Sequence, residues 1–355
     1  DEQLRPDAAD TLRYFAEQGV RLKVISGDNP RTVAAVARRV GLTTAEPVDA
    51  RQLPDDPGQM AEIVGDHAVF GRVTPRQKRS MVAALRSQGH VVAMTGDGVN
   101  DALALKDADI GVAMGSGAPA TRAVAQLVLL DSNFSVLPGV VAEGRRVIAN
   151  IERVANLFLT KNVSSLLLSL SVAVAGWPFP FLARQLTLVS EVAIGIPGFF
   201  LALGPNTGRF EHGFVRRVLS FAIPAGTIAA TAVMVAYGLA RSQHVAPREA
   251  RTAATIVFAM VSMWVLVIQA RPLRTWKAAL VGLMSGLFVL ALALPVGRSF
   301  YDVHLPPPST LFESIALGGA AAVALELSGR VAARFRHRPE APTGAVLAAA
   351  GGDDA

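Results

Sequence analysis

Residues 94–115, MTGDGVNDALALKDADIGVAMG, place four aspartates and four glycines among short apolar runs. Within and just before this stretch, HVVAMT (90–95) predicts a buried strand, DALALKDA (101–108) a helix, and DIGVAM (109–114) a second strand. Strands that alternate with helices in this way predict a parallel sheet covered by helices. Ligands of such folds bind at the carboxyl ends of the strands, so the turn TGDG after the first strand is a candidate site.

The same alternation of strands and helices extends through the first part of the chain. The further predicted elements are a helix over 5–19, a strand over 20–26, a helix over 30–40, a helix over 74–89 and a strand over 126–130. Residues 49–67, which contain DARQLPDDPGQ, are interpreted as a surface loop. We therefore assign residues 1–133 to one α/β domain.

Two carboxylates flank the turn of the opening stretch. Asp97 follows the strand, and Asp101 lies near the first turn of the next helix. Oxygen ligands placed in this way suit Mg²⁺, which proteins commonly hold with one or two carboxylates, and Gly96 and Gly98 let the backbone turn sharply. The alternative is that Asp101 only caps the helix and Asp97 is only a turn residue. The spacing alone leaves both interpretations open.

A similar turn, SGDNP, follows the strand over 20–26. Ser26 could donate its hydroxyl to a phosphate oxygen, whereas Asp28 and Asn29 could satisfy the first amides of the next helix, with capping favoured for Asn29. Lys78, on the helix over 74–89, is by itself best explained as a solvated charge. Together with Asp97 these groups nevertheless form a constellation that suits phosphoryl transfer.

The second part of the chain is apolar and helical. A pattern that starts at Phe134 passes without a break from charged to apolar residues, which predicts one helix that rises into a membrane. Five further spans are expected at 182–203, 218–240, 252–270, 277–297 and 310–333. We assign 134–335 to a stalk with a six-helix transmembrane domain and 336–355 to a disordered tail.

The distribution of charge orients these spans. Taken together, the loops at 205–217 and 271–277 and the tail RFRHR hold more Arg and Lys than the loops near 176–184, 241–251 and 298–309. The more basic side, with the soluble domain, is therefore expected in the cytoplasm. The net charge of +6 is explained in the same way, and no nucleic-acid motif or basic stripe is found. There is no cysteine, which excludes disulfides and thiolate metal sites. The opening DEQLRPDAAD is no signal peptide and resembles the middle of a domain.

Four of these segments, in this order, resemble the P-type cation-transporting ATPases. MTGDGVNDALAL is similar to their hinge motif TGDGVNDAPAL, with Leu103 where proline is usual. SGD resembles their TGD, VTPRQK their lysine motif, and DADIGVAMG is typical of the segment after the hinge. The resemblance covers the chain to about residue 335 and implies a haloacid-dehalogenase-like, Rossmann-like fold followed by the family's transmembrane segments five to ten.

The resemblance implies a role for each motif residue. Asp97 would ligate the catalytic Mg²⁺, and Asp101 would support the metal site. Ser26 and Asn100 would hydrogen-bond the phosphoryl group, and Lys78 would neutralise it. Gly27 and Asp28 complete the SGD motif, in which Asp28 would help to orient the site. The implied activity is ATP hydrolysis coupled to cation transport in the cell membrane, with ATP as substrate and Mg²⁺ as cofactor.

Other motifs of the family do not occur in this sequence. DKTGT, which contains the phosphorylated aspartate, and the actuator motif TGES are both missing. No stretch remains for the nucleotide-binding domain or for the first four transmembrane segments. We therefore expect the chain to need the N-terminal part of a pump as its partner, and to be inactive without it.

The ion-binding pattern departs from that of calcium pumps in this family. Their fifth segment carries an Asn and, three residues later, a Glu; here Asn162 matches, but Ser165 replaces the acid. Their sixth segment carries Asn, Thr and Asp, whereas Ser190, Ala193 and Ile194 stand at these positions.

Glu191 is the acid that could compensate for the two that are lost. With Asn162 and Ser190 it forms our candidate site for the transported ion, and Gly195 and Pro197 are expected to break the helix beside it. The alternative is a structural salt bridge between Glu191 and Lys161, which is also a candidate built-in counter-charge. Ca²⁺ is the favoured ion, with Mg²⁺, Mn²⁺ and monovalent cations as alternatives. Heavy metals are disfavoured because Cys-Pro-Cys does not occur.

Two other functions are considered. A phosphatase of the same fold fused to membrane helices would need a nucleophile in a DxD motif. DAD at 107–109 has this spelling but follows a helix rather than the first strand. The other alternative is a non-catalytic membrane subunit that binds a partner containing the missing half.

Overall fold

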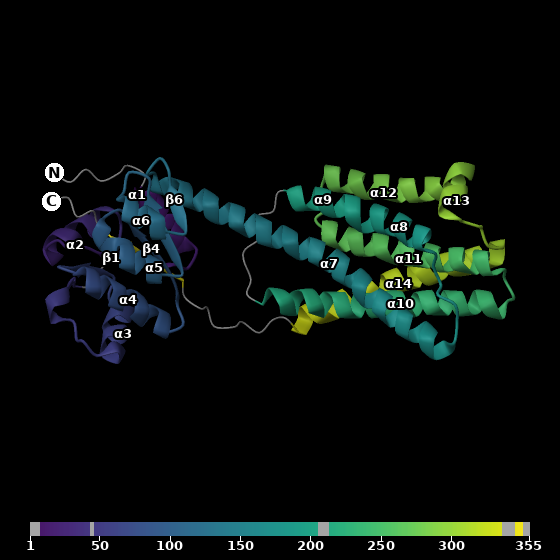
Figure 1. Cartoon of the computed structure of the whole chain (residues 1–355), viewed down its shortest axis with the longest axis horizontal. Helices are drawn as coiled ribbons and strands as arrows, with labels where there is room; N and C mark the ends of the chain where they lie inside the picture. The colour runs from purple at the N-terminus through teal and green to yellow at the C-terminus, as the bar shows by residue number, and fades with distance from the viewer. Residues whose placement is uncertain (1–7, 43–45, 205–212, 336–344, 351–355) are drawn as a thin grey trace. The chain divides into compact units, whose positions relative to one another are not determined.

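The chain forms two compact units, which are described separately. The computed structural model describes residues 8–42, 46–204, 213–335 and 345–350 (Figure 1). One unit contains residues 1–142 and 340–355, and the other contains residues 143–339. The division falls inside a long helix, a few residues after the boundary expected at residue 134.

The first unit contains a seven-stranded sheet in the order β2-β3-β1-β7-β4-β5-β6. Every neighbouring pair is parallel, which confirms the predicted parallel α/β fold. The strands are β1 (Arg21–Ile25), β2 (Val48–Asp49), β3 (Val69–Gly71), β4 (Val91–Gly96), β5 (Ile110–Met114), β6 (Leu127–Leu129) and β7 (Ala345–Ala350).

Helices cover both faces of this sheet. They are α1 (Ala8–Glu17), α2 (Pro30–Arg39), α3 (Pro57–Asp66), α4 (Pro75–Ser87), α5 (Ala102–Asp107) and α6 (Pro119–Val124). On one face α3, α4 and α5 pack on alternate strand residues such as Ile25 and Met94. On the other face Phe15 of α1 packs with Val112 of β5. The alternation along each strand produces these two cores, because successive side chains point to opposite faces.

The segment interpreted as a surface loop, residues 49–67, is mostly ordered secondary structure. Asp56 accepts a hydrogen bond from the backbone N–H of Gln59 at 2.9 Å, and Pro57 occupies the first helical position of α3. The cluster of Asp, Pro and Gly therefore starts a helix instead of a loop. Met60 and Val64 then anchor α3 in the core, both at most 5% exposed.

The expectation of a disordered tail over 336–355 is wrong for residues 345–350. These residues form β7, which lies between β1 and β4 and pairs with both along five residues each. An apolar run can enter a central place in a sheet because both ladders satisfy its backbone N–H and C=O groups. The rest of the expected tail, 336–344 and 351–355, lies outside the described residues.

The second unit is helical. Its elements are α7 (Leu137–Ala175), α8 (Ala183–Ser190), η4 (Glu191–Gly195), α9 (Ile196–Leu203), α10 (Phe214–Ser242), α11 (Pro247–Ala270), α12 (Thr275–Ala293), α13 (Pro295–Tyr301) and α14 (Pro308–Phe335). In the described part of the chain six helical segments are long and apolar enough to cross a membrane, as predicted. The helix α7 is continuous over 39 residues, and α10, α11 and α14 pack side by side (Figure 1).

The second span contains a widened helical turn where a break was expected. Residues Glu191–Gly195 form a π-helical turn, in which the backbone N–H of Ile196 donates to the carbonyl of Glu191. Pro197 has no N–H and its ring crowds the preceding turn, and the extra residue of a π turn relieves this conflict without ending the helix. The span therefore runs on from α8 through η4 into α9.

Candidate functional site

A buried ion pair lies at the centre of the candidate site in the first unit. The ammonium Nζ of Lys78 lies 2.8 Å from Oδ1 of Asp101, and the two side chains are 1% and 3% exposed. This burial contradicts the interpretation of Lys78 as a solvated charge. Taking two charges out of water is costly unless they pair well, so the arrangement fixes both groups in one geometry.

The start of α4 explains where Lys78 lies. Thr74 and Gln77 form a capping box, in which the N–H of Gln77 donates to Oγ1 of Thr74 at 3.3 Å and the N–H of Thr74 donates to Oε1 of Gln77 at 3.0 Å. Pro75 occupies the first turn. Because these signals fix the first residue of α4, they also fix which face of the helix carries Lys78.

A glycine makes room for the carboxylate of Asp101. A Cβ atom on Gly96 would lie 2.6 Å from Oδ2 of Asp101, closer than any side chain tolerates. Asp101 makes no capping hydrogen bond with its side chain at the start of α5. The alternative interpretation of Asp101 as a simple N-cap is therefore wrong, because its carboxylate binds Lys78 instead.

The loop that carries Asp97 is held by the segment after β5. The backbone N–H of Ala118 donates to the carbonyl of Asp97 at 2.8 Å. The hydroxyl of Thr121, which is fully buried, donates to the carbonyl of Gly98 at 2.7 Å. Sequence reasoning missed Thr121, since nothing in its local pattern marks a loop that is distant in sequence. Asp97 itself is half-buried and Asn100 is exposed in this loop.

The SGD turn after β1 is organised by its own side chains. The buried hydroxyl of Ser26 donates to Oδ2 of Asp28 at 3.0 Å, and the N–H of Asp28 donates back to Ser26 Oγ at 3.1 Å. Asn29 accepts from the N–H of Arg31 at 3.0 Å, so the expected capping is confirmed. Gly27 and Asp28 are exposed. A phosphate oxygen would therefore compete with Asp28 for the hydroxyl hydrogen of Ser26.

The carboxylates of this site could supply part of the coordination shell of a magnesium ion. Among the described residues there is no cluster of three or more His, Asp or Glu side chains that could form a complete metal site. Asp97 and Asp101 stand in one short loop at the carboxyl end of β4, and Mg²⁺ commonly takes one or two carboxylates together with water and phosphate oxygens. Their roles as ligands, like those of Ser26, Lys78 and Asn100 toward phosphate, stay predictions.

The DAD segment at 107–109 lies at the other end of β4. Oδ2 of Asp109 accepts from the N–H of Val92, near the start of the strand, at 2.9 Å. Its Oδ1 lies 3.1 Å from Arg86, and Asp107 pairs with Arg79. These carboxylates are occupied by ion pairs at the edge opposite Asp97, which disfavours the phosphatase alternative.

The three predicted ligands of the transported ion are not gathered into an enclosed site by the described residues. Asn162 on α7 and Glu191 on η4 are both exposed, and the hydroxyl of the half-buried Ser190 donates to the carbonyl of Leu186 at 2.7 Å. Within the described ranges Glu191 forms no ion pair with Lys161, so the salt bridge considered as an alternative does not form here. The assignment of this site stays a prediction.

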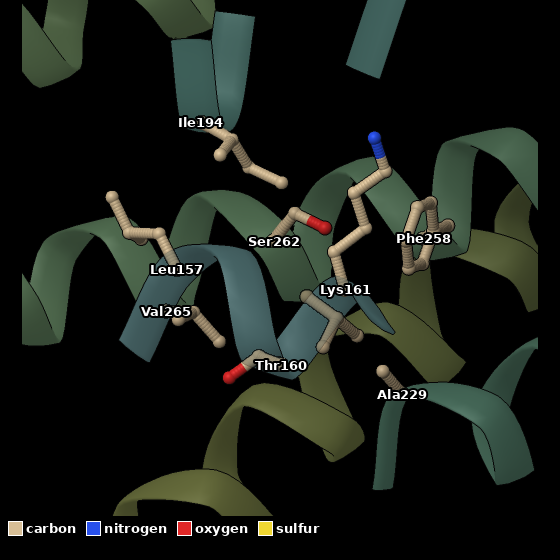
Figure 2. Close-up of a pocket in the computed structure, with 9 residues that line it drawn as sticks. Leu157, Thr160, Lys161, Ile194, Ala229, Phe258, Ser262 and Val265 are labelled. Atoms are coloured by element: carbon tan, nitrogen blue, oxygen red, sulfur yellow. The ribbon is translucent and has the colours of Figure 1, made fainter. Parts of the chain in front are cut away.

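A small cavity lies beside these residues. It has a volume of about 10 Å³, roughly the room for one water molecule. Figure 2 shows Thr160 and Lys161 on one helix and Ser262 across from them, with Ile194 and Phe258 among the apolar residues of the wall. The cavity is thus lined by α7, η4, α10 and α11.

Two further polar residues of α7 were missed by the sequence analysis. Asn156 donates to Oε1 of Gln269 at 3.2 Å, while its own Oδ1 and the Oγ1 of Thr160 are buried and have no hydrogen-bond partner among the described residues. Their spacing of four residues, continued by the buried Ser164, could have indicated a polar stripe inside an apolar span. In most proteins, buried polar atoms have a hydrogen-bond partner, either a protein group or an ordered water molecule.

The known proteins that resemble this chain match residues of both units. Residues 1–109 match the haloacid dehalogenase-like hydrolase family. The calcium-transporting ATPase CtpE of Mycolicibacterium smegmatis is 49% identical over 92% of this chain and 43% of its own length. The probable cation-transporting ATPase exp7 of Streptococcus pneumoniae is 35% identical over 87% of this chain and 41% of its own length.

A third relative extends the comparison. The calcium-transporting ATPase of Bacillus subtilis is 31% identical over 72% of this chain and 30% of its own length. The chain thus spans less than half the length of each of these three relatives.

Proposed function

Since the chain corresponds to the C-terminal portion of a P-type cation-transporting ATPase, we propose that it is the phosphate-positioning and ion-conducting part of a pump that moves Ca²⁺ across the cell membrane. In this pump ATP phosphorylates an aspartate of the N-terminal part, with Mg²⁺ as cofactor. The soluble unit would lie in the cytoplasm.

The observation that supports this proposal best is the buried pair of Lys78 and Asp101, in which Asp101 shares the loop after β4 with Asp97. The carboxylate holds the ammonium of Lys78 at 2.8 Å and thereby fixes its position near the edge where ligands bind in parallel sheets. In phosphoryl transfer the protein mainly positions groups and neutralises charge. Lys78 would neutralise the phosphoryl group, and Asp97 would be a ligand of Mg²⁺.

The position of β7 supports a proposal for where the phosphorylated aspartate of the N-terminal part would lie. Ile25 of β1 pairs with Ala350, and Thr95 of β4 pairs with Ala349, so the central strand ends between the turns that carry Ser26 and Asp97. A residue that follows a strand in this place would reach the predicted phosphate site. We infer that in the complete pump the strand before the phosphorylated aspartate takes this place, and that β7 leaves it.

The choice of Ca²⁺ rests on the relatives. The relatives from Mycolicibacterium smegmatis and Bacillus subtilis are named as calcium-transporting ATPases. Glu191 supplies a carboxylate in the second span and Asn162 an amide in the first, both of which are oxygen ligands that Ca²⁺ accepts. Mg²⁺, Mn²⁺ and monovalent cations are the alternatives, because Ser165, Ala193 and Ile194 stand where calcium pumps of this family have ligands.

A non-catalytic membrane subunit is the second candidate function. It would need a partner chain that contains DKTGT, a motif that does not occur among these 355 residues. In that case the described site would position groups for a partner without taking part in transfer.

The test is a complete pump, made by placing the N-terminal part of the Mycolicibacterium smegmatis relative before this chain. In membrane vesicles we expect ATP-driven uptake of radioactive calcium and an acid-stable phosphoenzyme that depends on Ca²⁺, with parallel assays in Mg²⁺, Mn²⁺ and Na⁺. The chain by itself should form no phosphoenzyme. The proposal would be refuted by aspartyl phosphate on the isolated chain. It would also be refuted if phosphorylation of the complete pump did not depend on Ca²⁺.

A further inference from the structure

Basic residues gather at one end of the six-helix unit, and some of them have acidic partners. Arg217 at the start of α10 pairs with Glu152 of α7 at 2.8 Å. Arg271, just before α12, pairs with Glu326 of α14, also at 2.8 Å. The charges of Arg217 and Arg271 are therefore neutralised within the unit.

Three other cations at this end have no such partner among the described residues. Arg153 of α7 is half-buried and donates only to Oδ1 of Asn150, at 3.3 Å. Lys277, in the first turn of α12, is 3% exposed, and its ammonium makes no hydrogen bond or ion pair within the described ranges. The third cation is Arg274, which is exposed just before α12. Both Arg153 and Arg274 repel the positive charge of Lys277.

The surroundings of Lys277 are those of a membrane interface. Its Nζ lies 5.6 Å from the ring centroid of Trp276, whose ring packs on Gly204 so closely that a Cβ there would meet it at 3.0 Å. The amide of Asn150 donates to the carbonyl of Gly204 at 2.8 Å, which ties α7 to the end of α9. Tryptophan and basic residues at the ends of spans are typical of the level of the lipid headgroups.

Three neighbouring cations without a counter-ion are unfavourable here, because Arg153 and Lys277 have lost water without gaining an opposite charge. We propose that Arg153, Arg274 and Lys277 form a binding site for the phosphate of an anionic phospholipid in the cytoplasmic leaflet. Basic pockets between transmembrane helices on this side are suited to anionic headgroups. The acyl chains would lie along the apolar surface of α12, where Leu283 and Leu290 are exposed.

The test uses the whole chain in detergent micelles, titrated with phosphatidylglycerol and, in parallel, with phosphatidylcholine and inorganic phosphate. Binding is counted by native mass spectrometry, and thermal unfolding is followed in the same samples. We expect phosphatidylglycerol alone to bind with high affinity and to raise the unfolding temperature. A cation near the membrane surface contributes about 1 kcal/mol, so Lys277→Met and Arg274→Gln should each weaken this binding about five-fold.

Arg330→Gln is the matched control, because Arg330 is an exposed cation at the same end that lies 3.9 Å from Glu326. It should leave the affinity unchanged. Arg274 is exposed, so Arg274→Gln keeps the test valid if Lys277→Met fails to fold.

Two results would overturn the proposal. One is an unchanged phosphatidylglycerol affinity in Arg274→Gln and Lys277→Met. The other is an equal effect of phosphatidylcholine or of inorganic phosphate.

Discussion

The two candidate sites of this chain differ in how their polar groups are satisfied. In the first unit Lys78 and Asp101 are buried and neutralise each other at 2.8 Å. In the membrane unit Asn162 and Glu191 are exposed on helices that are long and apolar enough to cross a bilayer. An exposed carboxylate at that depth would be costly in lipid, so its partners are expected from groups other than the described residues.

This difference indicates how much of each site the chain builds by itself. The charge at the carboxyl end of β4 is fixed by residues of β4, α4 and the following loop. The ion site, by contrast, would be completed only when other helices cover the face that carries Glu191. Four predictions test this comparison, in order of decreasing effect.

The largest effect is expected for Asp97→Asn in the complete pump. Loss of this negative charge from the magnesium shell should lower the rate of phosphorylation by about 100-fold or more, in the range found when one group that stabilises charge is removed. The measurement is phosphoenzyme formation from labelled ATP over a series of Mg²⁺ concentrations. Asp107→Asn, at the opposite edge of the sheet, is the control. A wild-type rate in Asp97→Asn would leave Asp97 as a turn residue only.

Glu191→Gln in the complete pump should lower the apparent affinity for the transported ion by about 10-fold or more, since a carboxylate contributes strongly to a cation site. Phosphorylation by inorganic phosphate should persist. In the isolated chain the same change should leave thermal stability unaltered, because Glu191 is exposed and unpaired with Lys161. Glu313→Gln, near the start of α14, serves as the control. Normal ion affinity together with lowered stability would remove Glu191 from the ion site.

Breaking the buried pair of Lys78 and Asp101 should destabilise the first unit. Asp101→Asn or Lys78→Met alone should lower the free energy of unfolding by about 3 to 5 kcal/mol, because the remaining charge is left buried and unpaired. The double variant should recover most of this loss. Hydrogen exchange of the β4 amides in the whole chain measures the free energy of unfolding of each variant. Additive losses in the double variant would show that the two groups do not depend on each other.

A smaller effect is expected at Lys23, which is also buried but whose ammonium binds backbone carbonyls instead of a carboxylate. Its Nζ donates to the carbonyls of Gly65 and His67 at 3.1 and 2.6 Å. Burial, with a smaller contribution from Arg21, lowers the pKa of Lys23 from 10.5 to about 8.

The sign of the pH dependence follows from this pKa. Between pH 8 and 10.5 the unfolded chain binds more protons at this residue than the folded chain does. The free energy of unfolding should therefore rise across this window, by on the order of 2 kcal/mol. In Lys23→Met this rise should disappear, as hydrogen exchange of β1 at several pH values would detect. An equal rise in both proteins would assign it to other groups.

Much of the fold could be predicted because its signals are local. The strands β1, β4 and β5 and the helices α2 and α4 follow from apolar runs bounded by Gly, Pro and capping residues. The helix α3 was missed although its signal is local too, since Asp56 and Pro57 were interpreted as a turn. The strand β7 could not be predicted, because nothing in an apolar tail indicates which strands it will pair with.

The sequence by itself determined the class of the fold, the six apolar spans and the motif residues at the ends of two strands, since periodicity and turn chemistry act over a few residues. Only the tertiary structure decided that Lys78 is buried against Asp101, that Thr121 holds the loop of Asp97, and that Glu191 stays exposed. These facts depend on contacts between segments far apart in the chain, where close packing and the cost of burying an unpaired charge select one partner among many.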